Sequence, residues 1–196
     1  AQPLRVEFCN ESDNIYDPIK STRAITSAWS FAMFALADLY SVEDMHHKVE
    51  IFQGAALFWT GYVDPKQYQE QYGPVPYPVD ICCVDGLTLL KNTLYDNGAT
   101  DYTGNRLESQ IVLDILGKIG FTAFKEYVNI YEQGMNDGVG DSPLDQTSIQ
   151  VEVFQGMYCD EVLKEILKKY GANIQQRDGI FCLYRPKELI DATIYG

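Results

Sequence analysis

The pattern that most constrains the fold lies in the last third of the chain. Over Cys159–Tyr170 apolar residues recur at helical spacing, and Gly171 follows directly, which is typical of a helix that ends in a left-handed residue. The tripeptide Arg-Asp-Gly at 177–179 then separates two short strand-like stretches and predicts a tight hairpin turn. Together with a strand predicted over 149–154, these patterns predict a compact β-α-β-β unit over residues 149–185.

Upstream patterns predict one long helix and several strands. Apolar residues at every fourth position over 107–119 predict an amphipathic helix. Two apolar stretches on either side of Gly54 predict a hairpin. Asp85 is the predicted N-cap of a short helix over 87–92. The predicted strands are 4–9, 25–36, 49–52, 57–63 and 79–84.

These elements predict an α+β fold with two domains. Residues 1–95 are expected to form a β-rich domain of barrel or sandwich type. Residues 96–196 are expected to form a smaller domain that contains the helix 107–119 and the β-α-β-β unit 149–185. The segment 121–148 has no predicted role. A chain of 196 residues is long enough to bury a substantial core in this arrangement.

The acidic net charge of the chain disfavours nucleic acid and anionic lipid as partners. The formal charge is −13, and the fifteen Lys and Arg residues are scattered along the chain. Tight nucleic-acid binding needs clustered cations, so we expect none. Docking on anionic lipid is disfavoured for the same reason. No apolar run is long enough to cross a bilayer, so we also expect no membrane insertion.

Cysteine and histidine spacing predicts neither a metal site nor a cofactor site. The five cysteines form no C-x-x-C pair and no zinc spacing, and each lies in or beside an apolar stretch. We therefore expect reduced, buried thiols. The only histidines, His46 and His47, are adjacent, and adjacent side chains on a strand point to opposite faces. The Gly/Asp loop at 136–141 lacks the ligand order of an EF-hand.

The residues leave two functions open besides a purely structural role. The first is a surface module that binds glycan or protein. The second is a cysteine hydrolase, in which a thiol would act as nucleophile with an imidazole as its base. The binding module would use Trp59, Tyr68, Tyr72 and Tyr77, and the hydrolase would use Cys83 or Cys159 with His46 or His47.

The order of several short motifs resembles a known family. The chain resembles prophage-encoded tail proteins of gut bacteria, of the baseplate-hub type found in long-tailed phages. The resemblance covers roughly residues 16–185, and its order and spacing are more specific than any one motif. The motifs are Tyr16–Ala24, Val49–Phe52, Leu57–Gly61, Tyr77–Val79, Asp85–Leu87 with Leu90-Lys91, Val162–Leu167, Gly171-Ala172 and Phe181–Tyr184.

The resemblance implies a structural component of a phage or prophage tail and not an enzyme. It implies no catalytic residues and no cofactor. It also implies a homo-oligomeric ring, with a trimer favoured, that joins other tail or baseplate subunits. Such a protein would be assembled in the bacterial host cytoplasm and be located in the virion tail. The residues expected at interfaces are Trp59, Tyr62, Tyr68, Tyr72 and Tyr77.

Overall fold

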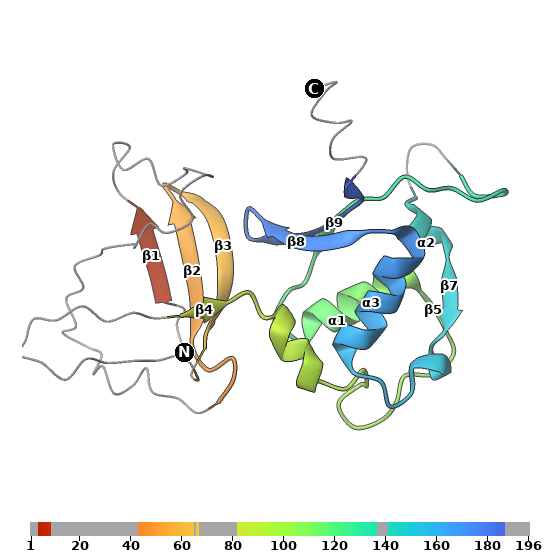
Figure 1. The fold of residues 1–196 in the computed structure, drawn as a ribbon, viewed down its shortest axis with the longest axis horizontal. Coiled ribbons are helices and arrows are strands. Elements are labelled where there is room, and N and C mark those ends of the chain that lie inside the picture. Colours follow the sequence, from red (N-terminus) through yellow and green to blue (C-terminus); the bar gives the residue numbers. More distant parts are fainter. Residues whose placement is uncertain (1–3, 9–42, 65, 67–81, 137–140, 187–196) are drawn as a thin grey trace, which may run out of the picture.

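The computed structural model describes residues 4–8, 43–64, 66, 82–136 and 141–186, and these residues form a mixed α+β structure (Figure 1). Its strands are β1 (Leu4–Phe8), β2 (Lys48–Gln53), β3 (Ala56–Val63), β4 (Cys83–Val84), β5 (Asn105–Leu107), β6 (Phe124–Tyr127), β7 (Ser148–Gln150), β8 (Asn173–Arg177) and β9 (Ile180–Tyr184). Its helices are the α-helices α1 (Glu108–Gly117), α2 (Pro143–Gln146) and α3 (Cys159–Tyr170) and the 3-10 helices η2 (Leu87–Asn92) and η3 (Val151–Phe154).

The first sheet has the strand order β1-β2-β3-β4. The predicted hairpin at Gly54 is confirmed as β2 and β3, and Gly54 adopts a positive φ of 61° in its turn. β1 runs parallel to β2, whereas β4 pairs antiparallel with β3 at Tyr62 and Val63. Within the described residues this sheet is open and does not close into a barrel. The predicted strand 25–36 and positions 79–81 lie outside the described residues.

The helix α3 has the predicted bounds, because local signals define both of its ends. The Glu161 carboxylate accepts a hydrogen bond from the Tyr158 backbone N–H at 3.0 Å, which satisfies a donor that the first turn leaves free. Gly171 ends the helix with a φ of 59°. The predicted helix 107–119 is confirmed as α1, although it spans Glu108–Gly117 and its first predicted residue belongs to β5.

The main core lies between α1 and α3 and under the sheet that contains β6, β8 and β9 (Figure 1). Its residues include members of α1, α2, α3, η2, η3 and β9, so elements far apart in sequence share one cluster. Its fully buried side chains include Leu90, Ile111, Val112, Ile115, Leu116, Leu144, Val162 and Phe181. Leu90 and Tyr95, which precede the predicted domain boundary at 95, belong to this cluster. The boundary itself stays a prediction.

The strands of the predicted β-α-β-β unit do not share one sheet. β7 pairs antiparallel with β5 in a separate two-stranded sheet. β8 and β9 form the predicted hairpin, and both turn residues, Asp178 and Gly179, adopt positive φ. β6 then pairs in parallel with β9, which gives the order β6-β9-β8. The strand β6 lies in the segment 121–148 that sequence patterns did not assign.

The predicted strand 149–154 is wrong in its last four residues, 151–154. The chain leaves β7 at Gln150 and turns into the 3-10 helix η3. In that helix Val151 and Phe154 are buried, whereas Val153 is 65% exposed. Residues three apart share a face in a 3-10 helix, so the core accepts Val151 and Phe154 together only in this conformation. Strand alternation would instead have placed Val151 and Val153 on one face.

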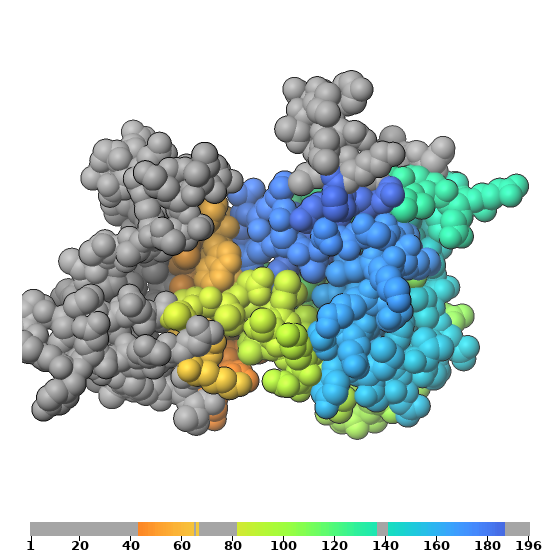
Figure 2. Space-filling model, viewed as in Figure 1, coloured from red at the N-terminus to blue at the C-terminus, as the bar shows by residue number. Residues whose placement is uncertain are grey.

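The first sheet and the helical core are joined along the edge of β3. Gln176 donates its side-chain amide to the Thr60 carbonyl at 2.8 Å and accepts the Thr60 N–H at 2.7 Å. The Gly179 N–H donates to the Phe58 carbonyl at 3.0 Å. The surfaces of β3 and the β8–β9 hairpin accordingly meet side by side (Figure 2). The hairpin thus covers the part of the β3 edge that the short strand β4 leaves open.

A candidate binding pocket between α3 and η3

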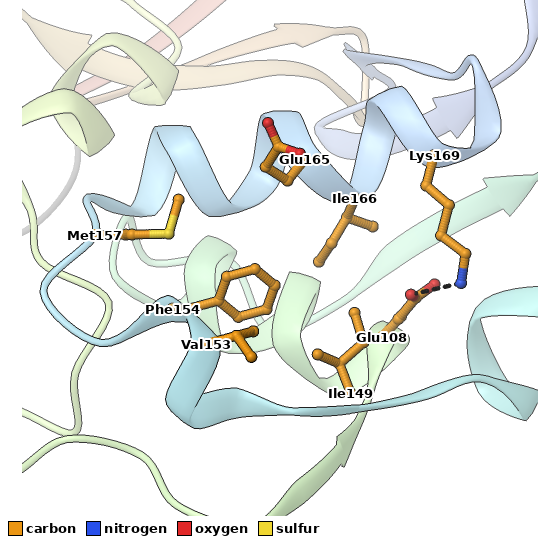
Figure 3. A pocket seen from close by; sticks show the side chains of 8 residues that line it. All are labelled: Glu108, Ile149, Val153, Phe154, Met157, Glu165, Ile166 and Lys169. Carbon is orange, nitrogen blue, oxygen red and sulfur yellow. Dashed lines mark hydrogen bonds and ion pairs between the residues drawn. The ribbon is translucent and has the colours of Figure 1, made fainter.

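A groove of about 460 Å³ lies between α3 on one side and β7 with η3 on the other (Figure 3). The helix α3 supplies three neighbouring lining residues at i, i+1 and i+4, which share one face of a helix. The helix α1 supplies a residue behind the groove. The lining residues are Glu108, Ile149, Val153, Phe154, Met157, Glu165, Ile166 and Lys169.

The walls of the groove are apolar along most of its length. Ile166 and Phe154 are buried and continue into the main core. Ile149 and Met157 are half-buried and pack against that core. Val153 is the most exposed large hydrophobic side chain of the described residues. The groove therefore offers apolar surface that reaches from the core to solvent.

The charged end of the groove is built from Glu108, Lys169 and Tyr170. Glu108 is fully buried, and one of its oxygens accepts a hydrogen bond from Lys169 Nζ at 2.9 Å. Its second oxygen accepts a hydrogen bond from the Tyr170 hydroxyl. Burial, followed by the bond to Glu108, raises the pKa of Tyr170 above its usual value. Both carboxylate oxygens are thus engaged inside the chain, as a buried charge requires.

A second carboxyl group, that of the half-buried Glu126 on β6, lies nearby, and its Oε1 atom is buried. Its Oε1 atom has no hydrogen-bond partner in the described part of the chain. The pKa of Glu126 is raised to about 7, chiefly by burial, and the carboxylates of Asp145 and Glu108 contribute to the rise. The Ser142 hydroxyl and the Leu144 N–H act in the opposite direction. Sequence reasoning missed Glu126, because a lone Glu on a four-residue strand carries no signal that it will be half-buried.

The cysteine and histidine residues of the predicted hydrolase are not brought together. The Cys159 thiol is buried and donates to the Leu94 carbonyl at 3.4 Å, and burial raises its pKa to about 11. Burial also raises the pKa of Cys83 to about 11. His46 Nδ1 lies 3.5 Å from a Glu43 carboxylate oxygen, and its ring lies edge-on against that of His47. Across the described residues no hydrogen bond joins either imidazole to a thiol. A nucleophilic cysteine needs a lowered pKa, so this arrangement disfavours thiolate chemistry.

The predicted aromatic interface is described only in part. Tyr62 is 5% exposed, and its hydroxyl donates to the Ile119 carbonyl at 2.9 Å, so the side chain packs within the chain. Trp59 is half-buried, and its ring lies beside Gly61. Tyr68, Tyr72 and Tyr77 lie outside the described residues. The groove between α3 and η3 was not among the predicted sites, because its walls come from elements that sequence patterns did not place together.

The described part of the chain contains no group of three or more His, Cys, Asp or Glu side chains that could hold a metal ion. None of its helices has the length and apolar character needed to cross a membrane. In comparisons with protein-family models, curated proteins and solved structures, no match to this chain was found.

Proposed function

We propose that this chain is a non-catalytic structural subunit of a phage or prophage tail, in the baseplate hub or tail tip. The main support for a non-catalytic role is the character of the groove between α3 and η3. Its walls are apolar, and its buried carboxylate is already bonded to Lys169 and Tyr170. Such a site is suited to bind the surface of another protein, because its polar groups are engaged in holding the fold together.

The assignment to a tail rests on the sequence resemblance over roughly residues 16–185. In this proposal residues 1–95 form the β-rich hub domain of barrel or sandwich type. Copies of the chain form a ring, with a trimer favoured, that binds other tail and baseplate subunits. The ring would be assembled in the host cytoplasm and remain in the virion tail. An acidic lining, suggested by the charge of −13, would avoid trapping DNA as it passes.

The test combines the assembly state of the chain with its location. Light scattering on the purified chain, alone and co-expressed with the products of neighbouring genes, would give the mass of any complex. Electron microscopy and antibody labelling of induced phage particles would locate the chain. We expect a ring and labelling at the tail end, with genes for a tape measure and a tail tube nearby. A chain absent from purified particles and encoded in a metabolic operon would contradict the proposal.

A further inference from the structure

We propose that the groove between α3 and η3 binds a segment of a partner protein that inserts one bulky apolar side chain and presents Lys or Arg beside it. The inference rests on the proposed function in one respect, since it takes the partner to be another subunit of the assembly. The kind of segment is inferred from the shape and charge of the groove itself.

The walls of the groove favour a bulky apolar side chain as the inserted group. Ile149, Phe154 and Ile166 form a continuous apolar surface, and Met157 lies at the end opposite the Glu108–Lys169 pair (Figure 3). Val153 forms the outer edge and leaves 65% of its surface to water. Methionine adapts its shape to different apolar partners because its side chain is unbranched and flexible. A Leu, Met or Phe side chain would remove this surface from water.

The charges around the groove favour Lys or Arg in the partner segment. Lys169 is already paired with Glu108, and Lys164 is paired with Asp160 at 2.7 Å. Glu165 lines the groove, is exposed, and has no ion-pair partner among the described residues. The segment 152–169 together with Glu108 carries five carboxylates and three ammonium groups. A cation beside the apolar anchor would therefore meet an unneutralised carboxylate.

The charge of the whole chain supports the same choice of partner. A formal charge of −13 attracts cationic segments and disfavours acidic ones. Complementary charge speeds the encounter and selects among partners, whereas buried apolar surface holds the complex together. The chain has 28 Asp and Glu residues against 15 Lys and Arg residues, so the preferred occupant is a basic segment from a different protein rather than an acidic segment.

The inference can be tested with two short peptides and the full chain. The probes are acetyl-Lys-Leu-Phe-Lys-amide and its charge-reversed counterpart, acetyl-Glu-Leu-Phe-Glu-amide. Titrations followed by NMR would report on the methyl groups of Val153 and Met157 and on the amide of Glu165. We expect the basic peptide to shift these signals at lower concentration than the acidic peptide. Its affinity should fall as ionic strength is raised from about 0.05 to 0.5 M, because salt screens exposed charges.

Two substitutions separate the apolar contact from the ionic one. Val153→Asn should weaken binding of the basic peptide about tenfold, because it places an uncharged polar group at the apolar edge. Glu165→Lys should weaken it roughly twofold to fivefold, as expected for an exposed ion pair, and should improve binding of the acidic peptide. Leu113→Glu on α1 and Glu132→Lys are matched controls at exposed positions outside the groove, and both should leave binding unchanged.

Several results would overturn the inference. Equal binding of both peptides, shifts outside the groove, or binding that survives Val153→Asn would remove the proposed site. Self-association through the groove that Val153→Asn abolishes would identify a second copy as the occupant instead. Failure of the peptide test with the chain still present in phage tails would reject this inference alone. Peptide binding by a chain absent from tails would reject the tail assignment and leave the binding site in place.

Discussion

At the scale of single residues, Glu126 is a carboxyl group whose surroundings oppose its ionisation. The residue is half-buried, its buried Oε1 atom has no hydrogen-bond partner in the described part of the chain, and the nearby Asp145 and Glu108 are acidic. The folded chain therefore holds the proton of Glu126 more tightly than the unfolded chain does. A raised pKa of this kind makes the folded state less stable as the pH rises.

Replacing Glu126 by Gln should remove this dependence. The cost of ionising Glu126 is absent below its unfolded pKa of 4.5 and fully present above its folded pKa of about 7. After allowance for solvent screening, we expect the difference in unfolding free energy between Glu126→Gln and the wild type to shift by roughly 1–2 kcal/mol in favour of the variant as the pH rises through this range. Urea unfolding from pH 4.5 to pH 8 would measure the difference. Parallel curves for the two chains would contradict the prediction, and exposed Glu132→Gln is the control.

Gly61 is a second residue with a sharp local requirement. A Cβ atom there would collide with the Trp59 ring and the Val84 carbonyl. Gly61→Ala should therefore lower the unfolding free energy by roughly 1–3 kcal/mol, as overpacking does. Gly117 at the end of α1 has no atom within 4 Å of a Cβ position, so Gly117→Ala should be neutral or stabilise by up to about 1 kcal/mol. Thermal unfolding of both variants would check the contrast; equal effects would refute it.

At the scale of elements, the β8–β9 hairpin has two roles. It closes on itself through the turn at Asp178 and Gly179, which local sequence predicts. It also covers the edge of β3, where Gln176 bonds to both backbone groups of Thr60. A side-chain amide has one donor and one acceptor side, so it can replace a neighbouring strand at a single position.

Removing that amide should loosen the edge of β3. Gln176→Ala leaves the Thr60 N–H and carbonyl without their partners, which should cost roughly 1–3 kcal/mol. Hydrogen exchange at the Thr60 amide should become faster, while exchange within α3 should be unchanged. Asn173→Ala on the same strand is exposed and serves as the control. Unchanged protection of Thr60 would show that the amide does not hold this edge.

At the scale of the whole molecule, the described residues join the first sheet to the helical core through a small set of contacts. Besides the Gln176 bonds, Tyr62 is buried and its hydroxyl donates to the Ile119 carbonyl. Gly120 follows with a φ of 82°, and a Cβ there would lie 2.7 Å from the Tyr62 hydroxyl. The close approach of these two parts therefore depends on Tyr62 and on the small residue opposite it.

This joint predicts a single unfolding transition for the wild-type chain. Tyr62→Phe should keep that transition and lower the unfolding free energy by about 1 kcal/mol, because it removes one hydrogen bond. Tyr62→Ala also removes the ring, and it should separate the loss of β3 from the loss of α1 and α3. Urea unfolding followed by hydrogen exchange would distinguish the two outcomes. Simultaneous unfolding of all three elements in Tyr62→Ala would contradict a joint at this residue.

Sequence alone determined the elements whose signals are local. The bounds of α3, the body of α1 and the two hairpins follow from helical periodicity, a C-terminal glycine and turn residues with positive φ. These signals act within a few residues, so they can be predicted without knowing what the element packs against. The mixed α+β class follows from the same elements.

Only the tertiary structure decided the pairing of β7 with β5, the parallel pairing of β6 with β9, and the turn of residues 151–154 into η3. Each depends on burial against residues distant in sequence. The groove arises from the same choices, because η3 exposes Val153 while Val151 and Phe154 enter the core. The local pattern over 149–154 fits a strand, and packing overrides it because two buried side chains three residues apart outweigh a short alternation.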